Sequence, residues 1–247
     1  MFKVNKELSG QIIRSTNALH VGDIYAKGVH YYVKPDNEKK EVLAYDLGRL
    51  AKLNVVPYES IKVRDHFYFV SKDLKENGSF LLAEDVLGST NNIQELLSKM
   101  RKLTIYQEEM EFDFYRMYFF DFLFLNSDRY PRNFGFWKVQ GEWKLVMFDH
   151  MCLFDVKYPL AMRFNDDHFQ KRATLESYYL DFKEFLSFLS QDVLGEFQNM
   201  VDLYSLDVVR NEIKRISSNK ENEYMMIYTD HYERVKKLLN RGVKYGR

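Results

Sequence analysis

The chain has 247 residues, of which 46% are hydrophobic and 16% aromatic, enough for one large domain or two small lobes around a shared cleft. Lys plus Arg and Asp plus Glu both number 36, so the zero net charge argues against nonspecific nucleic-acid binding as the main role. The only cysteine, Cys152, excludes an intrachain disulfide or a thiolate zinc site, which favours a reducing, cytoplasmic setting.

The first part of the chain, residues 1–87, predicts a β-rich lobe with one helix. A helix is expected over residues 38–53, where Leu43, Leu47 and Leu50 form one apolar stripe. Alternating polar and apolar side chains favour β structure in three other segments. These segments are 11–34, 61–74 and 79–87.

The remaining residues, 88–247, are expected to be mostly helical. Residues 91–125 predict one or two helices, and residues 170–245 repeat Leu, Phe, Val and Met at steps of three and four. A small β-rich lobe followed by a larger helical lobe is the layout of an α+β, bilobal protein-kinase-like fold. ATP binds between the two lobes of such a fold.

The sequence contains no segment that predicts membrane insertion. The most apolar stretch, residues 117–125, is too short to cross a bilayer and contains Asp121. Residues 1–13 lack the apolar core of a signal peptide. We therefore expect a cytoplasmic protein with no membrane partner.

Residues 124–149 combine polar side chains at a spacing that phosphoryl transfer uses. Asp128 precedes Asn133 by five positions, and two short strands with a turn at Gly141 then lead into Asp149. Protein kinases place a catalytic aspartate, a metal-binding asparagine and a second metal-binding aspartate in this order. Mg²⁺ is held by one or two protein oxygens together with phosphate oxygens, and Asn133 and Asp149 could supply the protein oxygens. Asp128 would orient the attacking hydroxyl or accept its proton.

The alternative is a surface loop rich in turn-forming residues. Two features favour the active site. The loop follows a strongly apolar run at residues 117–125, and Asp149 ends a predicted strand that is expected to be buried. An uncompensated carboxylate is unfavourable there unless it meets a cation.

Lys34 and Glu41 are candidates for the ion pair that a kinase cleft needs. Lys34 ends a predicted strand, and Glu41 lies on the following helix, away from its leucine stripe. The cation would contact the nucleotide phosphates and the anion would hold it in place. Two solvated surface charges are the alternative, and Glu38 is a competing partner for Lys34.

The phosphate-covering loop is the least defined part of the pattern, because the sequence contains no G-x-G-x-x-G. The candidate is residues 14–18, with Ser15, Thr16 and Asn17, whose hydroxyls and backbone N–H groups could cradle phosphates without glycines. An ordinary N-terminal turn is an equal alternative.

These segments together resemble the HipA-type kinases of bacteria, which are related in fold to phosphoinositide kinases. The resemblance covers roughly residues 12–155. The matching segments are YYVKP at 31–35, LNV at 53–55, DFLFLNSDRYPRNFGF at 121–136 and LVMFD at 145–149.

The resemblance implies ATP-dependent phosphorylation of Ser or Thr on a protein, with Mg²⁺. By position, Asp128 is then the catalytic aspartate, Asn133 and Asp149 are metal ligands, and Lys34 contacts phosphates while Glu41 braces it. The segment 79–85, which includes Glu84 and Asp85, takes the place of the inter-lobe hinge that binds adenine.

Family members often act as toxins with an antitoxin partner and phosphorylate themselves in the phosphate loop, for which Ser15 and Thr16 are the candidates. Two positions depart from the family pattern: Tyr130 replaces a usual His, and His150 follows the metal aspartate. The kinase lobe is also expected to begin near residue 1, without the extra N-terminal subdomain of longer toxins.

Two further functions fit the same sequence. A phosphotransferase for a small molecule or lipid head group would use the same catalytic residues, and Tyr130 lies where an acceptor should bind. An inactive pseudokinase that serves as a binding module would explain the phosphate loop without glycines.

Overall fold

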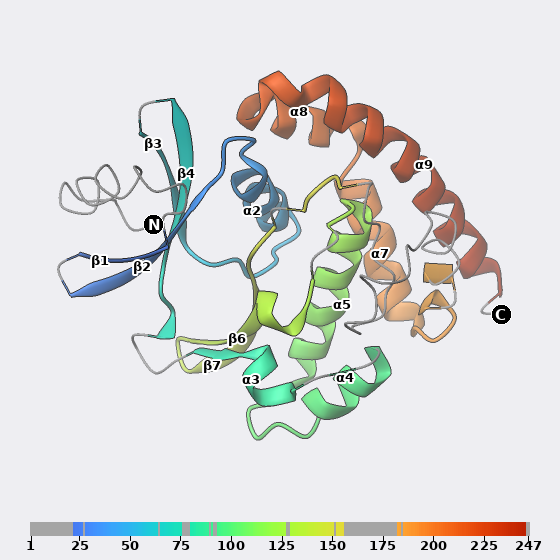
Figure 1. The fold of residues 1–247 in the computed structure, drawn as a ribbon. Helices are drawn as coiled ribbons and strands as arrows, with labels where there is room; N and C mark the ends of the chain where they lie inside the picture. Colours follow the sequence, from blue (N-terminus) through green and yellow to red (C-terminus); the bar gives the residue numbers. More distant parts are fainter. Residues whose placement is uncertain are drawn as a thin grey trace.

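The computed structural model has a β-rich lobe beside a larger helical lobe (Figure 1). It describes residues 22–26, 28–63, 65–75, 80–88, 90, 93–126, 129–150, 152–155, 182–183 and 185–245. Ser15, Thr16, Asn17 and Asp128 lie outside the described residues.

Four antiparallel strands form the first sheet, in the order β1-β2-β4-β3. Lys34 of β2 pairs with Phe69 of β4. The turn between β1 and β2 contains Gly28, whose φ of 74° suits glycine. The strands are β1 Asp23–Ala26, β2 Val29–Pro35, β3 Tyr58–Val63 and β4 His66–Lys72.

Helix α2, Lys40–Leu50, follows β2 and packs between this sheet and the C-terminal helices (Figure 1). Leu43 and Leu47 are fully buried as the apolar stripe predicts, but Leu50 is 39% exposed. Tyr45, which is not part of that stripe, is buried instead and packs against Phe69 of β4.

The expectation of one strand over 61–74 was wrong, because that segment contains a hairpin turn. Strand β3 ends at Val63, β4 begins at His66, and these two residues pair with each other. Consecutive charged residues, Arg64 and Asp65, interrupt the apolar pattern between them. Asp is favoured in turns because its side chain hydrogen-bonds nearby backbone.

A second sheet has the order β5-β6-β7 and contains the expected hairpin. Its strands are β5 Phe80–Leu82, β6 Phe134–Val139 and β7 Glu142–Met147. Gln140 and Gly141 have φ of 52° and 93°, so both central residues of this turn are left-handed, as in type I′ hairpins.

The expected strand over 79–87 is strand for three residues only. Helix α3, Ala83–Leu87, follows β5 directly and carries Glu84 and Asp85 in its first turn. Two carboxylates in a first turn favour helix, since they face the positive end of the helix dipole.

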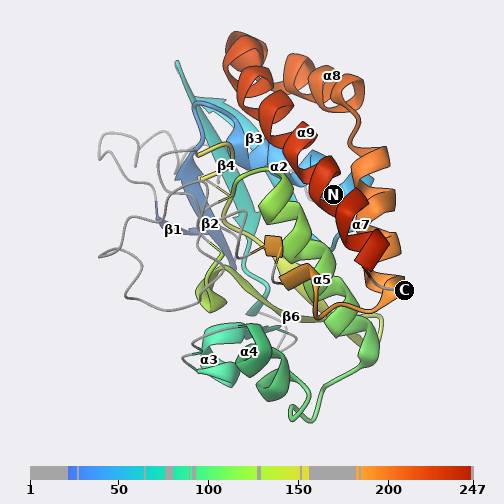
Figure 2. The ribbon, with the colours of Figure 1, turned by 90° about the vertical axis from the view of Figure 1, so that its right-hand side faces the viewer.

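The helical lobe is built around α5, whose buried side chains include four consecutive residues from Met117 to Phe120. Figure 2 shows α9 running beside α7 and α8 over this core. No described helix is both long and apolar enough to cross a membrane. The helices are α4 Ile93–Met100, α5 Glu108–Leu123, α7 Gln191–Leu203, α8 Leu206–Ile216 and α9 Glu221–Tyr245.

Candidate active site

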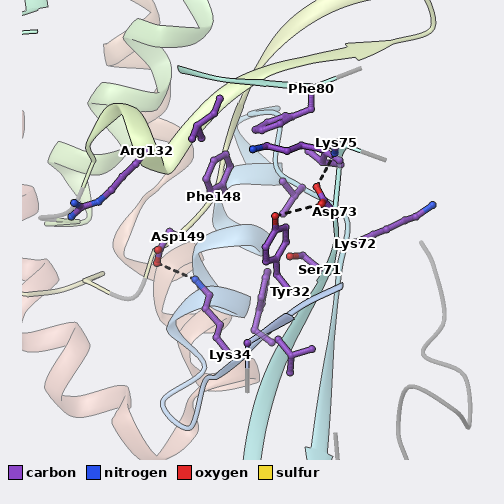
Figure 3. A pocket seen from close by; sticks show the side chains of 16 residues that line it. Tyr32, Lys34, Ser71, Lys72, Asp73, Lys75, Phe80, Arg132, Phe148 and Asp149 are labelled. Carbon is purple, nitrogen blue, oxygen red and sulfur yellow. Dashed lines mark hydrogen bonds and ion pairs between the residues drawn. The ribbon is translucent and has the colours of Figure 1, made fainter. Parts of the chain in front are cut away.

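A cavity of about 470 Å³ lies between the four-stranded sheet and the β5-β6-β7 sheet (Figure 3). Its volume is within the range of small-molecule and cofactor sites, about 300–1,000 Å³. One part of its wall is apolar and the other carries charged side chains. The apolar residues are Val33, Val56, Phe69, Leu74, Phe80, Leu82 and Phe148.

Lys34 points across the cavity wall to Asp149, with 3.0 Å between Nζ and Oδ1 (Figure 3). The same Nζ donates to Oε1 of Glu41, so the ion pair between Lys34 and Glu41 is present. Glu38 lies elsewhere, where it pairs with Lys40 and Lys220.

Charge and burial act against each other in this trio. Burial lowers the pKa of Lys34, but Glu41 and Asp149 outweigh it, so the net pKa is raised. Burial likewise raises the pKa of Glu41, yet the hydrogen bond from His150 and the charge of Lys34 bring it down to about 2. Both residues are therefore ionised at neutral pH.

Asp36 fixes the start of α2 and hence the position of Glu41. Its carboxylate accepts the backbone N–H groups of Glu41 and Val42, each at 3.3 Å. Burial first, and then the nearby Glu41 charge, raise the pKa of Asp36 to about 6.

Asp149 has a left-handed backbone, with φ of 59°. This conformation is uncommon for a residue other than glycine. Its side chain is 41% exposed and lines the cavity. The neighbouring residue Phe148 donates its N–H to the carbonyl of Asn133 at 3.2 Å, which ties Asn133 to the residue that precedes Asp149.

Arg129 ties this region to α5. Its guanidinium binds both carboxylate oxygens of Asp121, at 2.7 and 3.1 Å, and donates to the carbonyls of Asn133 and Phe148, the latter at 2.6 Å. Arg129 is 2% exposed. Burial lowers its pKa, but Asp121 raises it more, so the charge is retained.

The expected site residues fall into three groups. Lys34, Glu41 and Asp149 meet at the cavity. Asn133, at the end of the 3₁₀ turn Pro131–Asn133, is buried and does not line the cavity, but its carbonyl accepts the Phe148 N–H. Glu84 and Asp85 are exposed on α3 and do not line this cavity. Asp128, Ser15, Thr16 and Asn17 lie outside the described residues.

The cavity is lined by part of the segment expected to bind adenine, residues 79–85, and also by a segment that was not expected there. The end of β4 and the residues after it, from Ser71 to Lys75, line the wall, together with Phe80 and Leu82 of β5. Helix α3 begins at Ala83, and its residues Glu84 and Asp85 do not line the cavity.

Sequence reasoning missed Arg129, Asp121 and His150 as parts of the site. In the sequence, Arg129 follows Asp128 in a polar segment, and such a pair usually indicates exposed charges because Arg is seldom fully buried. The available signal was Asp121 inside the apolar run, since a carboxylate buried there requires a cationic partner.

The donor set fits Mg²⁺. The described residues contain no group of three or more His, Cys, Asp or Glu side chains that could hold a metal. Mg²⁺ needs no such group, since one or two protein oxygens plus phosphate oxygens and water complete its shell. Lys34 occupies Oδ1 of Asp149, while Oδ2 has no hydrogen-bond partner among the described residues.

Comparison with known proteins defines the class of fold. No protein-family model matches the sequence, and no curated protein sequence matches it. Solved structures do match, and they are kinase-like. The chain therefore has a kinase-like fold, which confirms the fold class expected from the sequence.

Two particular structures match over almost the whole chain. The proinflammatory kinase CtkA of Helicobacter pylori superposes with a TM-score of 0.67 at 13% identity, covering 91% of this chain and 94% of CtkA. HipA of Shewanella oneidensis, solved with HipB and operator DNA, has a TM-score of 0.61 at 10% identity, with 92% of this chain and 66% of HipA covered. The resemblance to HipA-type kinases thus holds at the level of fold.

Proposed function

We propose that this chain is an ATP- and Mg²⁺-dependent kinase of HipA type that phosphorylates Ser or Thr on a protein. The observation that carries the proposal is the convergence of Lys34, Glu41 and Asp149 at one end of a cavity between the two sheets. In kinases a lysine held by a glutamate contacts the nucleotide phosphates, and an aspartate holds the Mg²⁺ that neutralises them. The kinase-like fold is consistent with it.

In this proposal the apolar part of the cavity holds adenine. Val33, Phe69 and Phe148 offer apolar surface to a base, and the segment from Ser71 to Lys75 offers backbone groups along its edge. A pocket with mainly apolar lining and a few polar groups is typical of cofactor sites. The base therefore lies away from Asp149, and the phosphates lie towards it.

Each charged residue then has one task. Lys34 contacts the phosphates, while Glu41 holds the Lys34 ammonium group in place. Asn133 and Asp149 hold Mg²⁺, which when bound neutralises charge on the phosphate oxygens. Asp128, which directly precedes Arg129, orients the acceptor hydroxyl and accepts its proton.

A small-molecule or lipid head-group acceptor is the second candidate. Tyr130, whose ring lies under the Arg132 guanidinium at 4.7 Å, stands where the family pattern has His. A different acceptor is one physical reason for a different side chain at this point. Toxin activity, an antitoxin partner and a cytoplasmic setting belong to the HipA-type form of the proposal.

A panel of acceptors tests the proposal. Wild-type chain and Asp149→Ala are given Mg·ATP with a Ser/Thr peptide library, a metabolite mixture and lipid head groups. The proposal predicts peptide or protein phosphorylation by wild type alone. Phosphorylation of a metabolite without any of protein would replace it with the second candidate, and failure to bind Mg·ATP would favour an inactive binding module.

A further inference from the structure

The backbone at Asp149 adopts a conformation that needs support from its surroundings. Its φ of 59° lies in the left-handed region, where a non-glycine residue persists only when neighbouring contacts hold it. Strand β7 ends at Met147, so ladder hydrogen bonds do not supply that support. The contacts on either side of Asp149 therefore decide where its carboxylate points.

On the N-terminal side, Arg129 holds the peptide group before Asp149. Its Nη1 donates to the Phe148 carbonyl at 2.6 Å and also to the carbonyl of Asn133. The guanidinium cannot move freely, since Asp121 on α5 binds it through two oxygens. Planar, two-point pairing of this kind fixes orientation as well as position.

On the C-terminal side, Glu41 holds the peptide group after Asp149. Its Oε1 accepts the His150 backbone N–H at 2.7 Å, and the same carboxylate pairs with Lys34. Glu41 is fully buried. It therefore does more than brace Lys34, because it also ties α2 to the residue that follows Asp149.

We propose that Arg129 and Glu41 are positioning residues that clamp the backbone on both sides of Asp149 and so aim its carboxylate at bound Mg²⁺. The metal role of Asp149 rests on the proposed function. The clamp itself rests on the hydrogen bonds of Arg129 to Asp121, Asn133 and Phe148, on the hydrogen bond from the His150 N–H to Glu41, and on the backbone angle. Neither residue is a proposed metal ligand, and each acts through a backbone group of Phe148 or His150.

Amide hydrogen exchange on the ligand-free chain tests the clamp directly. Arg129→Lys keeps the positive charge but loses the planar fork. We expect exchange of the His150 amide, which Arg129 does not touch, to accelerate at least about tenfold through local opening. Amides inside α5 should keep their wild-type rates. Arg116→Lys, a change on α5 at an arginine paired with Glu196, is the matched control.

The reciprocal variant is Glu41→Ala, with Glu38→Ala as its control. The clamp predicts faster exchange of the Phe148 amide, which Glu41 does not touch. This measurement still decides the question if Arg129→Lys fails to fold. Unchanged exchange at the remote amide in a folded variant, or acceleration spread equally through α5, would overturn the clamp.

Metal affinity provides the second readout. Mn²⁺ accepts the same oxygen ligands as Mg²⁺ and is visible by electron paramagnetic resonance. With a non-transferable ATP analogue bound, we expect Arg129→Lys to weaken Mn²⁺ binding by about 10- to 100-fold. This is the usual effect of losing a residue that orients a metal ligand. Affinity for metal-free nucleotide should not change. Wild-type Mn²⁺ affinity in this variant would refute the positioning role.

The outcomes separate the clamp from the proposed function. A wild-type chain that binds Mn²⁺ and nucleotide but transfers no phosphate would refute the kinase proposal and leave both clamp tests valid. A wild-type chain that binds no nucleotide would refute the kinase proposal, and the exchange experiment alone would then decide the clamp.

Discussion

Lys34 is the residue on which the proposed chemistry depends most directly. It contacts both Glu41 and Asp149 and lines the cavity. We expect Lys34→Met to lower the rate of phosphoryl transfer at least about 100-fold, the usual effect of losing one preorganised electrostatic contact. Lys99→Met, on α4, should keep the wild-type rate. A folded Lys34→Met chain with undiminished transfer would show that Lys34 plays no part.

Asp36 should make stability depend on pH. Its pKa rises from 3.8 unfolded to about 6 folded, so it favours folding at pH below 3.8, and this contribution is lost as pH rises through 6. We expect the wild-type free energy of unfolding to fall by up to about 3 kcal/mol more than that of Asp36→Asn between pH 4 and 7. Parallel urea titrations of the two chains measure this difference, and superimposable pH profiles would rule it out.

Glu41 has the opposite pH dependence. Its pKa falls from 4.5 to about 2, so its contribution is present above pH 4.5 and is lost as pH drops towards 2. Asp36 and Glu41 therefore favour folding in different pH ranges, although they lie on the same short segment. At neutral pH the ionised Glu41 pairs with Lys34, and the same negative charge disfavours ionisation of Asp36.

At the scale of elements, the contact between β5 and β6 depends on one glycine. A Cβ on Gly135 would lie 2.6 Å from the Leu81 carbonyl oxygen and 2.6 Å from the Phe80 ring. Because the carbonyl belongs to a paired strand, it cannot move away without breaking the ladder. We expect Gly135→Ala to lower the free energy of unfolding by about 1–3 kcal/mol, as overpacking does.

Gly195→Ala is the control for this prediction. Gly195 lies inside α7 and nothing lies within 4 Å of a Cβ placed there. Alanine should therefore stabilise the helix by roughly 0.5–1 kcal/mol. Chemical denaturation of both variants gives the two values. The account of the β5–β6 contact fails if Gly135→Ala is as stable as wild type.

At the scale of the molecule, the sequence predicted the bilobal layout because its long elements are strongly periodic. The hairpin of β6 and β7 and helices α2, α4 and α5 lie where the patterns indicate. Short apolar runs were harder. The run over 61–74 hid a tight turn, and the run over 79–87 changed from strand to helix at Ala83.

The candidate site was predictable where a motif carries its own chemistry. Lys34, Glu41 and Asp149 were singled out by residue type and spacing, and the structure brings them together. The contacts around them were not predictable, because Arg129 and Asp121 are eight positions apart in the sequence and their pairing is a feature of the folded chain. The roles of all these residues in phosphoryl transfer remain predictions.

Transfer of labelled γ-phosphate from Mg·ATP tests the central claim most directly. Wild type and Asp192→Asn, a change on α7, should transfer label, whereas Asp128→Asn and Asp149→Asn should lose at least about 100-fold in rate. Mass spectrometry of the chain would then locate any self-modification, with Ser15 and Thr16 as the expected positions. Wild-type transfer by a folded Asp149→Asn chain, or no transfer by wild type to any acceptor, would contradict the account.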